Sequence, residues 1–356
     1  MKYLPFEATS FSYTIKLINE IRQNSRSSWN IFKDCPLVTL NRGKIPPYII
    51  ACGDRNRVEY ISGLLDEGTA VLLNERMKAH GKPAGRVAVA LGTYKGVPVA
   101  VFEHLMGTPS VEILVKEVTS PEYCAVHEPY KVPTTVFRPP EVVHLVRVGS
   151  CGGVNSPDSP ELSVVQCGDI IIMNKVIGVT GCDIQSITGS LDLLSTKTVE
   201  KARATLLDLG FEEEGDDKIL VKKSDPGVSS KLSAGAVAAR AKLVKDFPVD
   251  PEHKFTSHVL GYTSKDSLYC ESNEEEFMAL RKDHGVACSE MEASCLVRLS
   301  AQREVSSAPL RAGAVCGVIG AIPGESFCSD RSVIKSAVTW ACYTGLEGVC
   351  GFAKML

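Results

Sequence analysis

Four short segments place small or polar residues directly after apolar runs that predict strands. These segments are residues 53–57, 103–108, 147–153 and 290–292. In an α/β sheet, the loops at the carboxyl ends of the strands form the ligand crevice. The repeated position of the four segments therefore predicts one shared site.

Two of these segments carry the residue types that bind oxyanions. Glycine lets backbone N–H groups approach an anion, and arginine presents a fork of donors; Gly53, Arg57 and Arg147 supply both. Arg147 stands inside the apolar run LVRVGS, where an unpaired guanidinium is expensive to bury. Either a bound anion or a structural carboxylate such as Asp169 would satisfy it.

The segment Glu290-Met291-Glu292 offers two carboxylates. In extended backbone side chains alternate, so only one of the glutamates would face the crevice. A carboxylate there can accept two hydrogen bonds from a vicinal diol such as a ribose. The structural alternative is a helix N-terminus, where acidic residues interact favourably with the helix dipole.

Strand and helix patterns alternate along the chain, and several strands are continuously apolar, which indicates a sheet covered by helices on both faces. We therefore predict an α/β fold, a single-domain mixed sheet flanked by helices. The expected strands are 48–52, 86–91, 97–102, 142–148, 169–173, 258–263, 286–289 and 312–319. The expected helices cover 58–65 and 197–209, begin at Thr108-Pro109 and near Ser332, and follow Asn273, which forms a capping box with Glu276.

The chain is predicted to hold one domain at 46–356, preceded by an N-terminal extension at 1–45. In that extension Phe11, Ile15 and Ile18 have helical spacing. The Pro-rich stretch 119–140 and the polar stretch 210–256 are interpreted as insertions, which elaborate the fold rather than build it.

Composition argues against several classes of protein. The net charge of −3 over 356 residues does not suggest a nucleic-acid partner. No apolar run approaches the ~20 residues that span a bilayer, and the N-terminus lacks a signal-peptide stretch, so we expect no membrane partner and a cytoplasmic location. The 13 cysteines form no C-x-x-C pair, so we expect them to be buried and reduced, with no metal site.

Taken together, these motifs resemble those of the nucleoside phosphorylase family, which includes uridine phosphorylases and hexameric-type purine nucleoside phosphorylases. GDRNRVEYISGLLD is similar to GDPxRVxxIAxxLD, HLMGTPSVEILVKEV to GxGxPSxxIxxxEL, and HLVRVGSCGGV to LxRxGTxGGI. CSEMEASCL resembles ExEAxxL, and APLRAGAVCGVIG resembles the strand that closes the site. The motifs occur in the family's order from about residue 48 onward.

The resemblance implies a role for each matching residue. Arg76 would reach the neighbouring subunit's site, which implies a homodimer or a multiple of dimers. Met291 and Glu292 would hold the ribose, and Leu268 and Ile319 would lie at the base. The implied phosphate ligands are Gly53, Arg57, Arg76, Arg147 and Ser150.

The implied reaction is phosphorolysis of a nucleoside to free base and (deoxy)ribose 1-phosphate. Arg147 and Glu292 are the residues expected to carry catalysis, by positioning and electrostatics. Phosphate is a co-substrate, and no cofactor is expected. The alternatives are a purine nucleoside phosphorylase and a non-catalytic nucleoside-binding homologue; a hydrolytic nucleosidase is disfavoured because the phosphate arginines are present.

The chain departs from both branches of the family. Where purine enzymes carry an Asp that protonates the base, GVIGAIPGE places Ala321. Where uridine phosphorylases carry a Gln-x-Arg pair that reads uracil, the segment KDSLYCESNEEEF has neither residue. The Asp-free strand and the GSCGG segment favour uridine.

Two further polar residues, Glu103 and His104, come shortly before the helix that is expected to begin at Thr108-Pro109. His104 is interpreted as a hydrogen-bonded wall residue, and ligand contact is the alternative. Glu103 replaces the family's usual small residue; it would pair with an arginine of the site or coordinate a cation at a subunit interface.

Overall fold

The computed structural model describes residues 46–72, 87–119, 142–247, 255–267, 274–304, 309–323 and 327–353. Several sequence predictions lie outside these ranges. They concern the extension 1–45, the capping residue Asn273, Arg76, Leu268 and all of the stretch 119–140 except its first residue.

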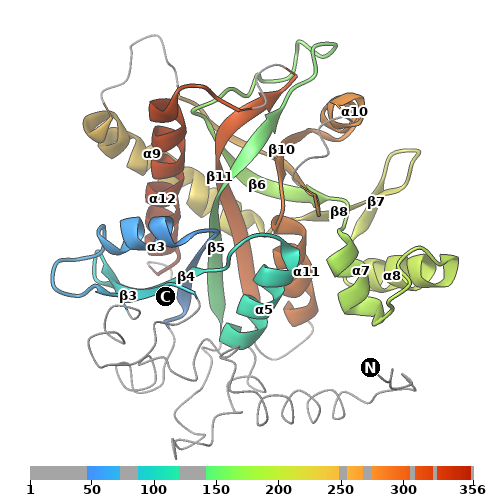
Figure 1. The fold of residues 1–356 in the computed structure, drawn as a ribbon, viewed down its shortest axis with the longest axis horizontal. Coiled ribbons are helices and arrows are strands. Elements are labelled where there is room, and N and C mark those ends of the chain that lie inside the picture. The colour runs from blue at the N-terminus through green and yellow to red at the C-terminus, as the bar shows by residue number, and fades with distance from the viewer. Residues whose placement is uncertain are drawn as a thin grey trace, which may run out of the picture.

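The described residues form one mixed sheet in the order β2-β3-β4-β1-β5-β10-β9-β6-β8-β7, with β11 pairing both β5 and β6. The longest strands, β5 and β11, run parallel from the pair Leu310↔Val143 to the pair Ile322↔Val154. They run side by side through the centre of the molecule in Figure 1. The strands are β1 (Tyr48–Cys52), β2 (Val71–Leu72), β3 (Val89–Tyr94), β4 (Val97–Glu103), β5 (Val143–Val154), β6 (Ile170–Ile177), β7 (Glu212–Glu214), β8 (Ile219–Lys223), β9 (Ser257–Ser264), β10 (Val286–Glu290) and β11 (Leu310–Ile322).

Helices cover both faces of this sheet, as predicted. In Figure 1, α9 and α12 pack together to the left of β5 and β11, and α5 and α11 lie to the right. The helices are α3 (Arg55–Ser62), α5 (Thr108–Thr119), α7 (Gly181–Thr188), α8 (Thr196–Asp208), α9 (Pro226–Asp246), α10 (Glu274–His284), α11 (Ala293–Glu304) and α12 (Arg331–Ala353). The predicted α/β fold is therefore confirmed.

The alternation of side chains along β5 divides the core. Val146 and Val148 face the core cluster shared with α9 and α12, whereas Leu145 faces the cluster shared with α5 and α11. Arg147 has the same parity as Leu145, so its side chain emerges on the α11 side of the sheet.

The stretch 210–256, interpreted from the sequence as an insertion, contains helix α9. Val228, Leu232 and Ala236 of this helix are buried in the same core cluster as Trp340 of α12. The Trp340 indole N–H donates to the Ala236 carbonyl at 3.1 Å. Small Ala and Gly side chains let α9 pack closely, and they also weaken the periodic pattern by which a buried helix is recognised.

Most strand predictions match the structure, but the predicted end of the strand at 142–148 is wrong. The segment GSCGG does not turn; β5 continues through it to Val154. The reason lies in its neighbours, because β11 pairs with it as far as Ile322 and β10 pairs Cys288 with Gly153. Strand pairing on both sides outweighs the low strand propensity of glycine.

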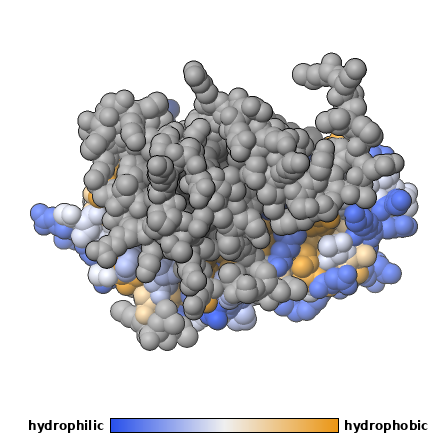
Figure 2. All heavy atoms as spheres, turned by 90° about the horizontal axis from the view of Figure 1, so that it is seen from below, coloured by the Kyte–Doolittle hydropathy of each residue, from blue (hydrophilic) through white to orange (hydrophobic). Residues whose placement is uncertain are grey.

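The surface mixes polar and apolar residues. Where described residues are visible in Figure 2, hydrophilic and hydrophobic patches lie side by side. The exposed large hydrophobic side chains include Leu191 and Leu194, in the connection between α7 and α8. None of the described helices combines the length and the apolar character needed to cross a membrane.

Candidate active site

A pocket with a volume of about 320 Å³ opens where β1, β5, β10 and β11 come together. Most of the predicted site residues line it. These are Gly53, Arg57, Arg147, Ser150, Met291, Glu292 and Ile319. Arg76 and Leu268 lie outside the described residues.

Arg57 is held on the wall of the pocket by the start of α3. Asp54 is the N-cap residue of this helix, and its carboxylate accepts from the Arg57 backbone N–H at 2.9 Å. The Arg57 guanidinium pairs with the same carboxylate at 3.1 Å and donates to the Val148 carbonyl at 3.0 Å. The turn after β1 thus delivers one cationic side chain to the pocket.

Arg147 is 4% exposed, and its partners are Glu290 and Glu292 rather than Asp169. Its guanidinium pairs with Glu292, and it lies 3.2 Å from Glu290. Asp169 instead accepts from His258, with 3.0 Å between the nitrogen and the oxygen. The suggestion that Asp169 pairs with Arg147 is wrong. Strand β10 lies beside β5, and the carboxylates at its end, Glu290 and Glu292, reach the α11 side of β5 where Arg147 lies.

Room for the Arg147 guanidinium exists because residue 149 is glycine. A Cβ at Gly149 would collide with the guanidinium of Arg147, which folds back over its own strand. Glycine at this position therefore serves the packing of the arginine.

Glu290, the last residue of β10, and Glu292 both line the pocket, so the expectation that only one of them would do so is wrong. The strand ends at Glu290 and α11 begins at Ala293, so the backbone turns between the two side chains. Glu290 accepts from the backbone N–H groups of Glu292 and Ala293 at 2.8 and 3.0 Å. It fulfils the structural alternative, an acidic residue at a helix N-terminus.

The pKa values of Glu290 and Glu292 are shifted in opposite directions. Burial raises the pKa of Glu290 to about 7, against the lowering effect of the Arg147 charge. Burial would also raise the pKa of Glu292, but the Arg147 charge and the hydrogen bond from the Gly107 backbone outweigh it and lower the pKa. Near neutral pH, Glu292 is therefore the ionised partner of Arg147, and Glu290 can carry a proton.

The loop after β4 completes the setting of Glu292. The Gly107 backbone N–H donates to the Glu292 carboxylate at 2.8 Å. Gly107 has a φ of 84°, a left-handed conformation that glycine adopts without strain. The loop and the Arg147 side chain therefore fix the carboxylate from two sides.

His104 is 2% exposed, but it is not among the residues that line the pocket, and it is not hydrogen-bonded as expected. Neither ring nitrogen has a hydrogen-bond partner among the described residues. Burial, assisted by the Arg147 charge, lowers the pKa of His104 to about 4. Glu103 accepts from the Ala88 backbone N–H at 2.7 Å, and no described arginine pairs with it.

Sequence reasoning missed part of the pocket wall. Lys265 follows β9 and could have been found by the rule that strand ends carry the site. The pocket lining also includes Asp54, Met106, Cys151 and Gly152, which lie in the four predicted segments but had no assigned role. The residues missed are Lys265, Ser289, Ile322 and Phe327; Ala321, noted only for the missing Asp, also lines the pocket.

A further contact of Arg147 had no local signal. Its guanidinium donates to the Cys316 sulfur at 2.8 Å. Burial would raise the pKa of Cys316, but the thiols of Cys151 and Cys288 and the Arg147 charge lower it well below its usual range. The contact depends on the register of β11 against β5, which pairs Cys316 with Gly149 and which no sequence pattern gives.

Comparison with known proteins finds a matching family model and several relatives. The family model described as the phosphorylase superfamily matches residues 47–327. Over 147 residues the chain is 27% identical to a purine nucleoside phosphorylase DeoD-type of Mannheimia succiniciproducens, covering 41% of this chain and 45% of that protein. Over 145 residues it is 25% identical to a uridine phosphorylase of Thermococcus kodakarensis, covering 41% and 39%. The chain thus matches less than half the length of these relatives.

Solved structures share the fold over most of the chain. A uridine phosphorylase of the oomycete Phytophthora capsici superposes with a TM-score of 0.57 at 18% identity, covering 86% of this chain and 90% of that one. A Trypanosoma brucei nucleoside phosphorylase with uridine phosphorylase activity gives 0.57 at 20% identity, covering 87% and 94%.

Proposed function

Since the chain belongs to the phosphorylase superfamily, we propose that it is a noncovalent nucleoside phosphorylase, which cleaves a nucleoside with inorganic phosphate. One observation carries the proposal. Apart from Arg76, which lies outside the described residues, the residues predicted to hold phosphate line the same pocket as those predicted to hold ribose, although they come from distant parts of the sequence. A pocket of about 320 Å³ suits a small-molecule ligand.

The reaction follows from the placement of charge. Phosphate would lie against Gly53, Arg57 and Ser150, with Glu292 accepting from the ribose hydroxyls. As the bond between C1′ and the base breaks, the sugar gains positive charge, which the phosphate stabilises before its oxygen bonds to C1′. The base leaves with the electron pair and takes a proton from solvent.

Arg147 has a switching role in this proposal. It is paired with Glu292 and lies close to Glu290. Because the pKa of Glu290 is raised to about 7, this carboxyl can be neutral when a dianion enters the pocket. A neutral Glu290 leaves Arg147 free to share its donors between Glu292 and the phosphate.

The base-binding end favours uridine. In this proposal the base lies against Ile319, Ala321 and Phe327, which line the pocket, and Ala321 can donate no proton to a purine. The purine alternative needs a proton donor there, so it is the second candidate.

The proposal extends to assembly and location. A homodimer, or a multiple of dimers, would let Arg76 enter the neighbouring site, and a cytoplasmic location would give access to both substrates. Sedimentation of the purified protein, followed by mixing of Arg76→Ala and Arg147→Lys chains, tests whether sites are shared. Recovery of activity in the mixture supports sharing, and two inactive populations without recovery contradict it.

The test of activity is turnover of uridine and inosine by purified, folded protein, with and without phosphate. Chromatography would follow the free base and the sugar phosphate. We expect uracil and ribose 1-phosphate from uridine only when phosphate is present. Hypoxanthine release instead would overturn the uridine preference. Release without phosphate, or no release, would contradict phosphorolysis, and the latter would favour the non-catalytic homologue.

A further inference from the structure

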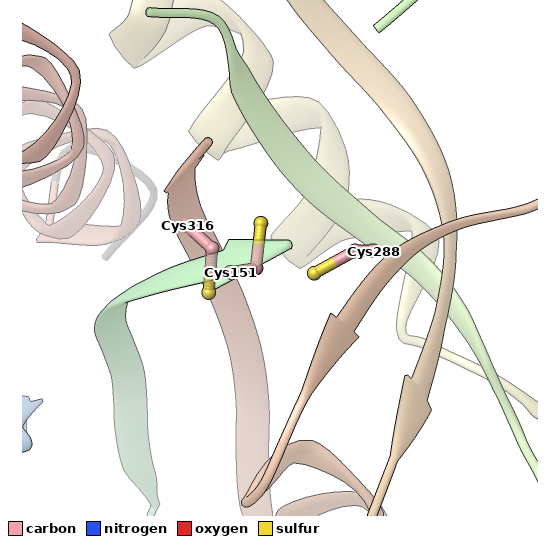
Figure 3. A group of neighbouring side chains, drawn as sticks. All are labelled: Cys151, Cys288 and Cys316. Carbon is pink, nitrogen blue, oxygen red and sulfur yellow. The ribbon is translucent and has the colours of Figure 1, made fainter. Parts of the chain in front are cut away.

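Three cysteines that are distant in sequence meet behind the pocket. Cys151 comes from β5, Cys288 from β10 and Cys316 from β11 (Figure 3). Their sulfur atoms all lie within 4.8 Å of one another. The convergence arises because β5 pairs with both other strands, so the absence of a spaced cysteine motif did not exclude it.

The spacing of the sulfur atoms suits a shared cation. With metal–sulfur bonds of about 2.3 Å, three sulfurs around one ion lie about 4 Å apart. The cysteines are 4%, 0% and 0% exposed, and their neighbours include Ala314, Val318 and Tyr262. Among the described residues no fourth cysteine, histidine or carboxylate joins the group. Three soft ligands in a dry setting suit copper(I) better than zinc, which prefers four.

The surroundings can balance the charge of such a centre. A copper(I) ion with three thiolates is net negative, and burying that charge alone would be expensive. The Arg147 guanidinium already donates to the Cys316 sulfur at 2.8 Å. Hydrogen bonds of this kind to a ligating atom orient the ligand and tune the metal.

An entry path exists from the pocket. Cys151 lines the pocket and is the one member of the trio with measurable exposure.

By contrast, Cys342 and Cys350 are buried at separate places along α12 and do not belong to the group. Burial of thiols therefore does not by itself produce the arrangement.

We infer that Cys151, Cys288 and Cys316 form a binding site for a soft, thiophilic cation of the copper(I) class. Metal loading would leave added negative charge directly behind Arg147. A second consequence rests on the proposed function: the copper-loaded protein should bind phosphate several-fold more weakly than the metal-free protein.

The experiment titrates the reduced full-length protein with copper(I) under nitrogen, against bicinchoninate as a coloured competing chelator. The variant Cys288→Ala removes one ligand, and Cys342→Ala is the matched control, since it removes a buried thiol outside the trio. We expect Cys288→Ala to take up one equivalent less copper than wild type, and Cys342→Ala to match wild type. Equal uptake by all three proteins would overturn the site.

A second measurement protects the test against a variant that does not fold. X-ray absorption at the copper edge, on wild type loaded with one equivalent, should show three sulfur neighbours; two sulfurs in a linear arrangement would overturn the assignment. Calorimetric phosphate titration of loaded and metal-free wild type then tests the coupling, and equal affinities would contradict it. If the metal-free protein binds no phosphate, the proposed function fails while the copper data still decide the metal site.

Discussion

Two buried arginines among the described residues each lie between two carboxylates, and one of them, Arg147, lines the pocket of the candidate site. Arg298 on α11 is 0% exposed and pairs with Asp183 at 2.7 Å and with Glu112 at 3.5 Å. Arg147 on β5 is 4% exposed and contacts Glu292 and Glu290. We call these groups the Arg298 centre and the Arg147 centre.

The two centres differ in how fully their hydrogen bonds are satisfied. In the Arg298 centre, Nε donates to Asp183 and Nη1 donates to Gln302 at 3.1 Å, while Asp183 also accepts from Ser294 at 2.6 Å. In the Arg147 centre, Nε has no partner among the described residues, and Glu290 has a pKa of about 7. A satisfied network rigidifies the fold, whereas an arginine that keeps an unpaired donor beside a pocket can change partners when a ligand binds.

The largest expected effect is on stability at the Arg298 centre. Arg298→Met leaves Asp183 buried without its cation, which should lower the free energy of unfolding by about 3–5 kcal/mol. Denaturant unfolding measures this, and the catalytic rate per folded molecule should stay close to wild type. A variant as stable as wild type would show that Arg298 is not structural.

The next effect is on catalysis at the Arg147 centre. Arg147→Lys keeps the charge but loses the fork of donors, so kcat/KM for phosphorolysis should fall by about 10²–10³-fold. Arg298→Lys is the matched control, and its kcat/KM should change little. Equal losses in the two lysine variants would erase the distinction between the centres.

A third effect concerns pH at the Arg147 centre. Glu290 has a folded-state pKa of about 7 against an ordinary 4.5, so the folded protein binds the extra proton between these values. Its contribution to stability is therefore lost as pH rises from 4.5 to 7, by about 3 kcal/mol. In Glu290→Gln this loss should be absent from the pH dependence of unfolding. Parallel curves for wild type and variant would refute the raised pKa.

The smallest effect has the opposite sign and comes from His104. Its folded-state pKa is about 4 against an ordinary 6.5, so the unfolded chain binds the proton first on acidification. Stability from this group is present above pH 6.5 and lost toward pH 4, amounting to about 2 kcal/mol between pH 6.5 and 5. His104→Asn should lose less stability over that interval than wild type in thermal melts. If the variant is equally acid-sensitive, His104 is not held neutral by its burial.

The sequence predicted the parts of the fold that depend on local patterns. The strand at Tyr48–Cys52 follows from a run of apolar residues, a pattern that acts over a few residues. The helix expected at 58–65 begins earlier, at Arg55, because Asp54 caps it. The pocket residues Gly53, Arg57, Arg147 and Glu292 followed from their positions after strands and from the family resemblance. Their roles as ligands stay predictions.

What could not be predicted depends on which strands become neighbours. Arg147 pairs with Glu290 and Glu292 rather than Asp169 because β10 lies beside β5. The cysteine trio has the same origin, since its members are far apart in sequence. The two glutamates both reach the pocket because the chain passes from strand to helix between them, a boundary that a short apolar pattern does not fix.

The most direct test of the account is calorimetric titration of phosphate into metal-free wild type, Arg147→Lys and Arg298→Lys. The account predicts that wild type and Arg298→Lys bind phosphate with similar affinity, and that Arg147→Lys binds at least about tenfold more weakly, a loss of about 1.4 kcal/mol. Undiminished binding by Arg147→Lys would contradict the claim that the Arg147 centre serves the phosphate.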